Sequence, residues 1–132
     1  MNVKNFILAG IIGGIADFLL GWLFYGILFR DYFGGGDPNL SFIFAGCMSF
    51  GFLMSYIYNA LTTLNALAGG AKVGAGIGVF TGLMENFFRS SMEANPNFQM
   101  MAMDVAICIL MGAGVGAAVA LTIGALSKKQ AV

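Results

Sequence analysis

The sequence predicts an all-α integral membrane protein, an antiparallel bundle of four transmembrane helices. Hydrophobic residues make up 59% of the chain and charged residues only 9%, with a mean hydropathy of +0.88. Soluble proteins average about 45–50% apolar and about 25% charged residues. Four segments each supply the roughly 20 apolar residues that cross a hydrocarbon core of about 30 Å. The short connections between them are typical of neighbouring helices that run antiparallel.

The chain is predicted to form a single four-helix domain over residues 1–132. Helices are expected because every backbone polar group in lipid must be hydrogen-bonded within its own segment. The predicted spans are residues 5–29, 41–64, 71–90 and 98–126.

The first span is apolar from Phe6 to Phe29, longer than the 7–15-residue core of a cleavable signal peptide, so we expect it to be retained. "RDYFGGGDPN" predicts a turn after it, because no strand or lysine accompanies the glycines as in a phosphate-binding loop. "NALAGG" and "SSMEANPN" predict the loops before the third and fourth spans.

Small residues recur every four positions along three of the spans, and we expect these positions to pack helix against helix. Such spacing lets two backbones approach closely, which gives van der Waals contact where lipid supplies no hydrophobic drive between helices. In the third span the row begins at Gly70, just before the predicted start. The expected packing residues are Gly10, Gly14, Gly74, Gly78, Gly82, Gly112 and Gly116.

The third span also carries charge, with Glu85 and Arg89 four residues apart on one helix face. Both disfavour membrane insertion, so we expect this span to lie inside the bundle. Asp104 in the fourth span falls at a similar depth, roughly 10 Å from the outer end. We therefore expect a buried network of Glu85, Asn86, Arg89 and Asp104, in which one guanidinium compensates two carboxylates and one negative charge or proton remains.

Asp17 lies in the middle of the first span, which contains no basic residue. The groups at its depth in other spans are hydroxyls, of Ser49, Ser55 and Thr81. Desolvation without a partner favours the neutral acid, so we expect Asp17 to be protonated or to hold a cation. The alternative is a structural hydrogen bond to a neighbouring helix. The candidate ion or proton sites are Asp17, Glu85 and Asp104, since ionisable groups within spans mark function by default.

Basic residues near the span ends predict the orientation in the membrane. Four lysines fall on one side: Lys4, Lys72, Lys128 and Lys129. Arg30 and Arg89 fall toward the other side, together with Asp31, Asp37 and Glu93. Both termini are therefore expected in the cytoplasm. Aromatic residues near the span ends are expected to anchor the helices at the interfaces: Trp22, Tyr25 and Tyr32 at the outer end, Tyr56 and Tyr58 at the inner end.

Several functional classes find no support in the composition. The chain has no histidine, the commonest general base and metal ligand, and we expect no metal, no cofactor and no enzymatic activity. The basic residues form no cluster, which argues against nucleic acid as a partner. Cys47 and Cys108 lie in apolar runs, where thiols usually act as small hydrophobes, so a disulfide is not expected.

The segment "GWLFYGILF", Gly21 to Phe29, resembles the first-helix signature of a family of small four-helix bacterial membrane proteins classed as a domain of unknown function. "SFGFLMSYIY", Asn86 followed by two aromatics, and a last span rich in small residues are similar in outline. Phe24 stands where that family more often has tryptophan. The resemblance implies a four-helix fold and the bacterial inner membrane, and it implies no activity.

Of two possible functions, the sequence favours the first. The first is a structural or accessory membrane protein, either a homo-oligomer or a subunit of a larger membrane complex, docked through its glycine-rich helix faces. The second is a dimeric proton- or cation-coupled transporter or channel that uses Asp17 with the Glu85, Arg89 and Asp104 network. It shares four helices and one acid in the first helix with small multidrug transporters, an analogy of architecture alone.

Overall fold

The computed structural model describes residues 1–33, 37–61 and 64–131. Within these ranges the chain is all-helical, with four helices: α1 (Val3–Gly21), α2 (Leu40–Tyr56), α3 (Leu67–Ser90) and α4 (Phe98–Gln130). α1 and α2 continue as π-helical segments, η1 (Trp22–Leu28) and η2 (Ile57–Leu61). Counted with these extensions, all four helices are long and apolar enough to cross a membrane.

Asparagines define the starts of three helices. The side chains of Asn2, Asn39 and Asn97 accept hydrogen bonds from backbone N–H groups in the first turns of α1, α2 and α4. This capping satisfies donors that have no partner within the helix. α2 and α4 accordingly begin within one residue of the predicted positions 41 and 98.

The third and fourth helices are longer than the sequence predicts. α3 begins at Leu67, so the prediction that "NALAGG" is entirely loop is wrong. Gly70 lies in this first turn, where its backbone packs against Gly116 and Ala120 of α4, and this contact offsets the low helix propensity of glycine. α4 ends at Gln130, whose side-chain amide donates to Asn5. The predicted turn at residues 34–36 and the predicted helix at 62–63 lie outside the described residues.

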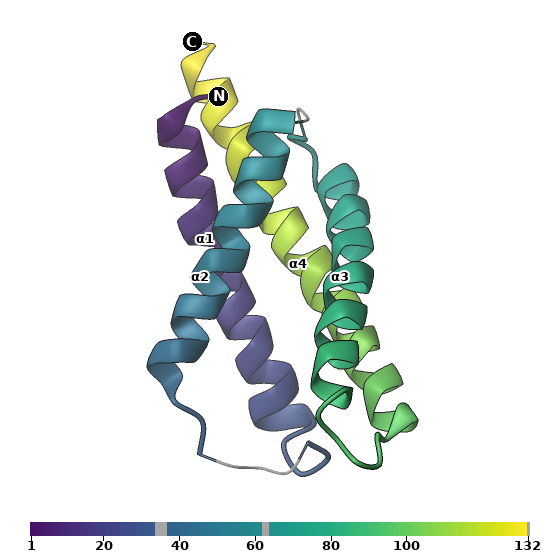
Figure 1. Cartoon of the computed structure of the whole chain (residues 1–132). Coiled ribbons are helices and arrows are strands. Elements are labelled where there is room, and N and C mark those ends of the chain that lie inside the picture. The colour runs from purple at the N-terminus through teal and green to yellow at the C-terminus, as the bar shows by residue number, and fades with distance from the viewer. Residues whose placement is uncertain (34–36, 62–63, 132) are drawn as a thin grey trace.

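The helices form two closely packed pairs, α1 with α2 and α3 with α4, joined mainly through the contact of α1 with α4. Both termini lie at one end of the molecule (Figure 1), here called the terminal end. The connections from α1 to α2 and from α3 to α4 lie at the opposite end, here called the loop end. α2 and α3 scarcely touch each other, so the bundle is open along this side.

The hydrophobic core fills the half of the bundle nearest the terminal end. Its fully buried members include Met54, Tyr58, Val115 and Val119. The Tyr58 hydroxyl donates to the Gly70 carbonyl oxygen at 2.6 Å. The prediction that Tyr58 is an interfacial anchor is wrong, because its side chain is fully buried and links η2 to α3.

All seven glycines expected to pack helices lie at helix contacts within the protomer. A Cβ at Gly74 would overlap the Gly112 carbonyl oxygen, and one at Gly78 or Gly82 would meet Cys108. In return, Gly112 and Gly116 face Gly74 and Gly70. In α1, Gly10 and Gly14 face Phe52 and Met48 of α2.

Gly74→Ala should lower the free energy of unfolding by about 1–3 kcal/mol, because a methyl group there has to separate the backbones of α3 and α4. Gly76 is the matched control, since it lies on the same helix with nothing within 4 Å of an added Cβ. Gly76→Ala should be neutral or stabilise by up to about 1 kcal/mol through helix propensity. Denaturant unfolding in detergent, followed by circular dichroism, measures both; equal effects would contradict the tight α3–α4 contact.

Candidate functional site

A cavity of about 450 Å³ lies in the open side between α2 and α3. All four helices and η1 contribute to its wall. Ile43, Phe50 and Met111 supply much of the apolar lining. The residues with polar or ionisable side chains are Asp17, Tyr25, Cys47, Thr81, Glu85, Arg89, Asp104 and Cys108.

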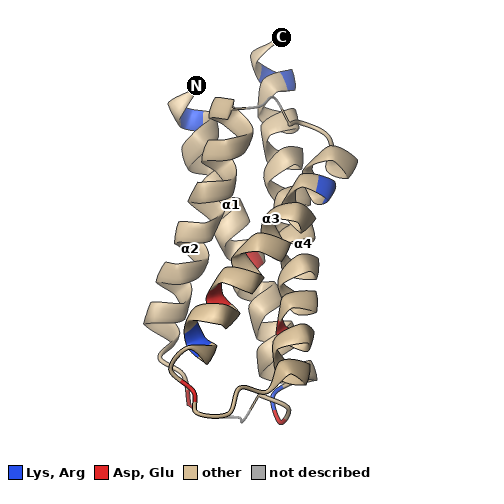
Figure 2. Ribbon diagram, turned by 45° about the vertical axis from the view of Figure 1, so that its right-hand side comes forward, with Lys and Arg blue, Asp and Glu red and all other residues tan. Residues whose placement is uncertain are grey.

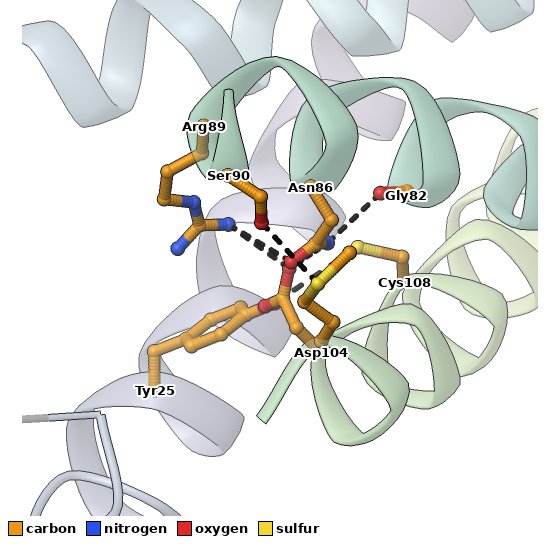
Figure 3. Close-up of polar contacts among 8 residues, drawn as sticks. Tyr25, Gly82, Asn86, Arg89, Ser90, Asp104 and Cys108 are labelled. Carbon is orange, nitrogen blue, oxygen red and sulfur yellow. Dashed lines mark hydrogen bonds and ion pairs between the residues drawn. The ribbon is translucent and has the colours of Figure 1, made fainter. Parts of the chain in front are cut away.

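Asp104 is the most highly connected of these residues (Figure 3). Its side chain is nearly fully buried. The Tyr25 hydroxyl donates to Oδ1 at 2.5 Å, the Asn86 amide donates to Oδ2 at 2.5 Å, and Arg89 Nη2 donates to Oδ2 at 3.2 Å. Both carboxylate oxygens are therefore satisfied, and one acid ties η1, α3 and α4 together.

The glycine row of α3 explains why Asn86 reaches Asp104. Asn86 continues the four-residue spacing of Gly78 and Gly82 and so lies on the face that packs against α4. Its amide also donates to the Gly82 carbonyl oxygen at 2.8 Å, which holds the side chain along the helix. The residue that ends the packing face therefore supplies a polar contact to Asp104.

Tyr25 was not anticipated as a site residue. Its hydroxyl points inward to Asp104, and the prediction that it anchors the helix at the membrane interface is wrong. The sequence could have pointed to it only indirectly, because a buried carboxylate needs hydrogen-bond donors and few polar side chains lie at that depth. Nothing in the local pattern distinguishes Tyr25 from the exposed aromatics around it.

Glu85 does not join the network as predicted. Asn86, Arg89 and Asp104 come together, whereas in the part of the chain that the structure describes Glu85 enters neither a hydrogen bond nor an ion pair. The Arg89 guanidinium reaches across to Asp104 of α4 instead of back along its own helix. Glu85 is exposed, and it lines the same cavity.

Asp17 is 8% exposed and forms part of the cavity wall. Its neighbour across the helix contact is the Cys47 thiol of α2. No ion pair involves Asp17 among the described residues. The three hydroxyls expected at its depth, those of Ser49, Ser55 and Thr81, all donate to backbone carbonyl oxygens. Of these residues only Thr81 lines the cavity.

Both cysteines line this cavity as free thiols. Cys108 Sγ lies 3.9 Å from the Tyr25 hydroxyl oxygen, and Cys47 lies beside Asp17. Their positions in apolar runs gave no indication of this polar setting. The described residues contain no group of three or more Cys, Asp or Glu side chains placed to hold a metal ion.

Compared with models of protein families, with curated proteins and with solved structures, the chain matches none of them. The resemblance of Gly21–Phe29 to the first-helix signature therefore stays a prediction.

Asp104→Ala should lower the free energy of unfolding by about 1–3 kcal/mol, because it leaves the Tyr25, Asn86 and Arg89 donors without their acceptor. Glu93→Ala removes an exposed carboxylate at the same end of the molecule and should change it by less than about 0.5 kcal/mol. Denaturant unfolding in detergent tests the pair. An Asp104→Ala protein as stable as the wild type would mean that the three hydrogen bonds contribute nothing.

Proposed function

We propose that this chain is an integral membrane protein that binds a proton or a small cation at Asp17 and carries it across the bilayer. One observation carries the proposal. Asp17 lies in the middle of an apolar helix, on the wall of a cavity of about 450 Å³, and pairs with no basic group among the described residues. An intramembrane acid in a cavity is the usual mark of a proton or ion pathway.

The proposed location is the bacterial inner membrane, with an antiparallel bundle and both termini in the cytoplasm. The length and hydropathy of the four helices support membrane insertion. Figure 2 shows basic residues toward both ends of the molecule and acidic residues in the middle and toward the loop end. All four lysines lie in the helix turns nearest the terminal end: Lys4, Lys72, Lys128 and Lys129. The excess of lysines favours a cytoplasmic terminal end. The resemblance at Gly21–Phe29 supports a bacterial membrane.

The charges around the cavity favour a cation over an anion. Three carboxylates, those of Asp17, Glu85 and Asp104, face one guanidinium, that of Arg89. Since Arg89 is paired with Asp104, the negative charge that remains belongs to Asp17 and Glu85. A cleft lined by one sign of charge with apolar walls concentrates counter-ions of the other sign.

The cavity is approached from the loop end. A second cavity of about 400 Å³, lined in part by Trp22, Gly26 and Pro38, shares Cys47 and Glu85 with the first. In the other direction the packed core around Tyr58 closes the bundle. Transport therefore requires α2 and α3, which scarcely touch, to move relative to each other so that Asp17 becomes accessible from the terminal end.

The second candidate is the structural or accessory role. The observation in its favour is the Asp104 network, which is fully satisfied by three donors and has no need of a transported ion. The glycine rows are already used within the protomer. A partner protein would therefore have to dock through other faces.

Asp17→Asn should abolish protein-dependent flux in proteoliposomes, because the amide cannot bind and release a proton or balance a cation. Proton entry is followed with a trapped pH-sensitive dye under an imposed membrane potential, and cation entry with radiolabelled sodium or rubidium. Asp31→Asn is the matched control, since it neutralises an exposed carboxylate outside the cavity, and it should retain flux.

Flux that persists in Asp17→Asn would rule out Asp17 as the transport site. No flux of either kind in wild-type vesicles, together with co-purification of a stoichiometric partner, would favour the structural role.

A further inference from the structure

We infer that the open side of the bundle, between α2 and α3, is the interface with a second copy of this chain, in which Glu85 of each copy pairs with Arg89 of the other. The inference rests on the proposed membrane location and not on transport through Asp17. It is based on the charged side chains of Glu85 and Arg89, on adjacent turns of α3.

Glu85 is the first. It lies within a candidate membrane span, Leu67–Ser90, and its side chain is exposed. No basic group pairs with it among the described residues. A carboxylate left facing lipid is strongly unfavourable, and charged residues in spans are almost always turned toward protein or water. In one copy Glu85 lines the cavity without a countercharge among the described residues, and a second copy would supply one.

Arg89 is the second. Its side chain is 48% exposed although it is paired with Asp104. The contacts to Asp104 and Asn86 both come from Nη2. In the described part of the chain, Nε and Nη1 make no hydrogen bond. The guanidinium is thus partly exposed and has donors left over, one helical turn from Glu85.

A two-fold related copy fits this pair of groups. In an isologous interface, residue i of one copy meets residue j of the other, and the reverse contact follows by symmetry. Glu85 and Arg89 differ in height by about 6 Å along α3, which two long side chains can bridge. Since the surface holds both signs of charge, it is complementary to itself. A different protein would have to supply both charges in the matching order.

The same contact would cover the side of the bundle where α2 and α3 scarcely touch. The cavity that holds Asp17 opens on this side and is lined by both Glu85 and Arg89. In the pair, the cavities of the two copies would face a common interface. The second copy would therefore complete a site that one copy leaves open to lipid.

Cross-linking in native membranes tests the geometry. Phe87 and Phe88 are 61% and 68% exposed at nearly the same depth, but about 100° per residue separates them around the helix. Phe88 flanks the Glu85–Arg89 face, whereas Phe87 lies on the far side. Phe88→Cys should form an intermolecular disulfide under mild oxidation, and Phe87→Cys should show no more cross-linking than the wild type with its native Cys47 and Cys108. Equal cross-linking at both positions would overturn the proposed interface.

Charge reversal tests the pairing. Glu85→Arg leaves the Asp104 network intact and places like charges across the interface. The dissociation constant of the dimer should therefore rise about tenfold or more. Glu85→Arg combined with Arg89→Glu should restore association if the double variant folds, which circular dichroism checks. Single-molecule photobleaching in liposomes counts the chains. A wild type that stays monomeric, or a Glu85→Arg variant that dimerises as well as the wild type, would refute the inference.

Discussion

The close approach of α3 and α4 is the contact on which the placement of the polar groups depends. Gly70, Gly74 and Gly78 present bare backbone to α4, so this face of α3 is turned toward α4. Thr81, Glu85 and Arg89 each lie one residue before the Gly82, Asn86 and Ser90 row, about 100° around the helix, and line the cavity on the open side. A larger side chain in the glycine row would push the helices apart, and Asn86 would no longer reach Asp104.

Two buried aspartates illustrate how environment separates residues of one chemical type. Asp104 accepts hydrogen bonds from three donors on two other elements, so both of its carboxylate oxygens are satisfied. Asp17 is almost equally buried but has a thiol for a neighbour and a cavity in front of it. The first arrangement holds helices together. The second is the arrangement on which the proposed proton or cation site rests.

The two halves of the bundle differ in how closely their helices pack. Near the terminal end, α1, α2, η2 and α4 surround a packed core, and Tyr58 fastens η2 to α3. Toward the loop end, α2 and α3 are apart and polar side chains take the place of the core. This difference is favourable for a binding site, because a cavity has to be held by parts of the fold that do not collapse.

The four apolar helices, the glycines at their contacts and the acids placed within them could be predicted from the amino-acid sequence. These follow from local properties: apolar length, the four-residue spacing of Gly74, Gly78 and Gly82, and the cost of a charge in lipid. The hydrogen-bond and ion-pair partners of the polar side chains could not be predicted, because they depend on how the helices pack. In the folded bundle Arg89 pairs with Asp104 and not with Glu85. The hydroxyl groups of Tyr25 and Tyr58 point inward, and Cys47 lies beside Asp17. The physical reason is that a long polar side chain can reach several neighbours, and the rotation and separation of the helices select among them.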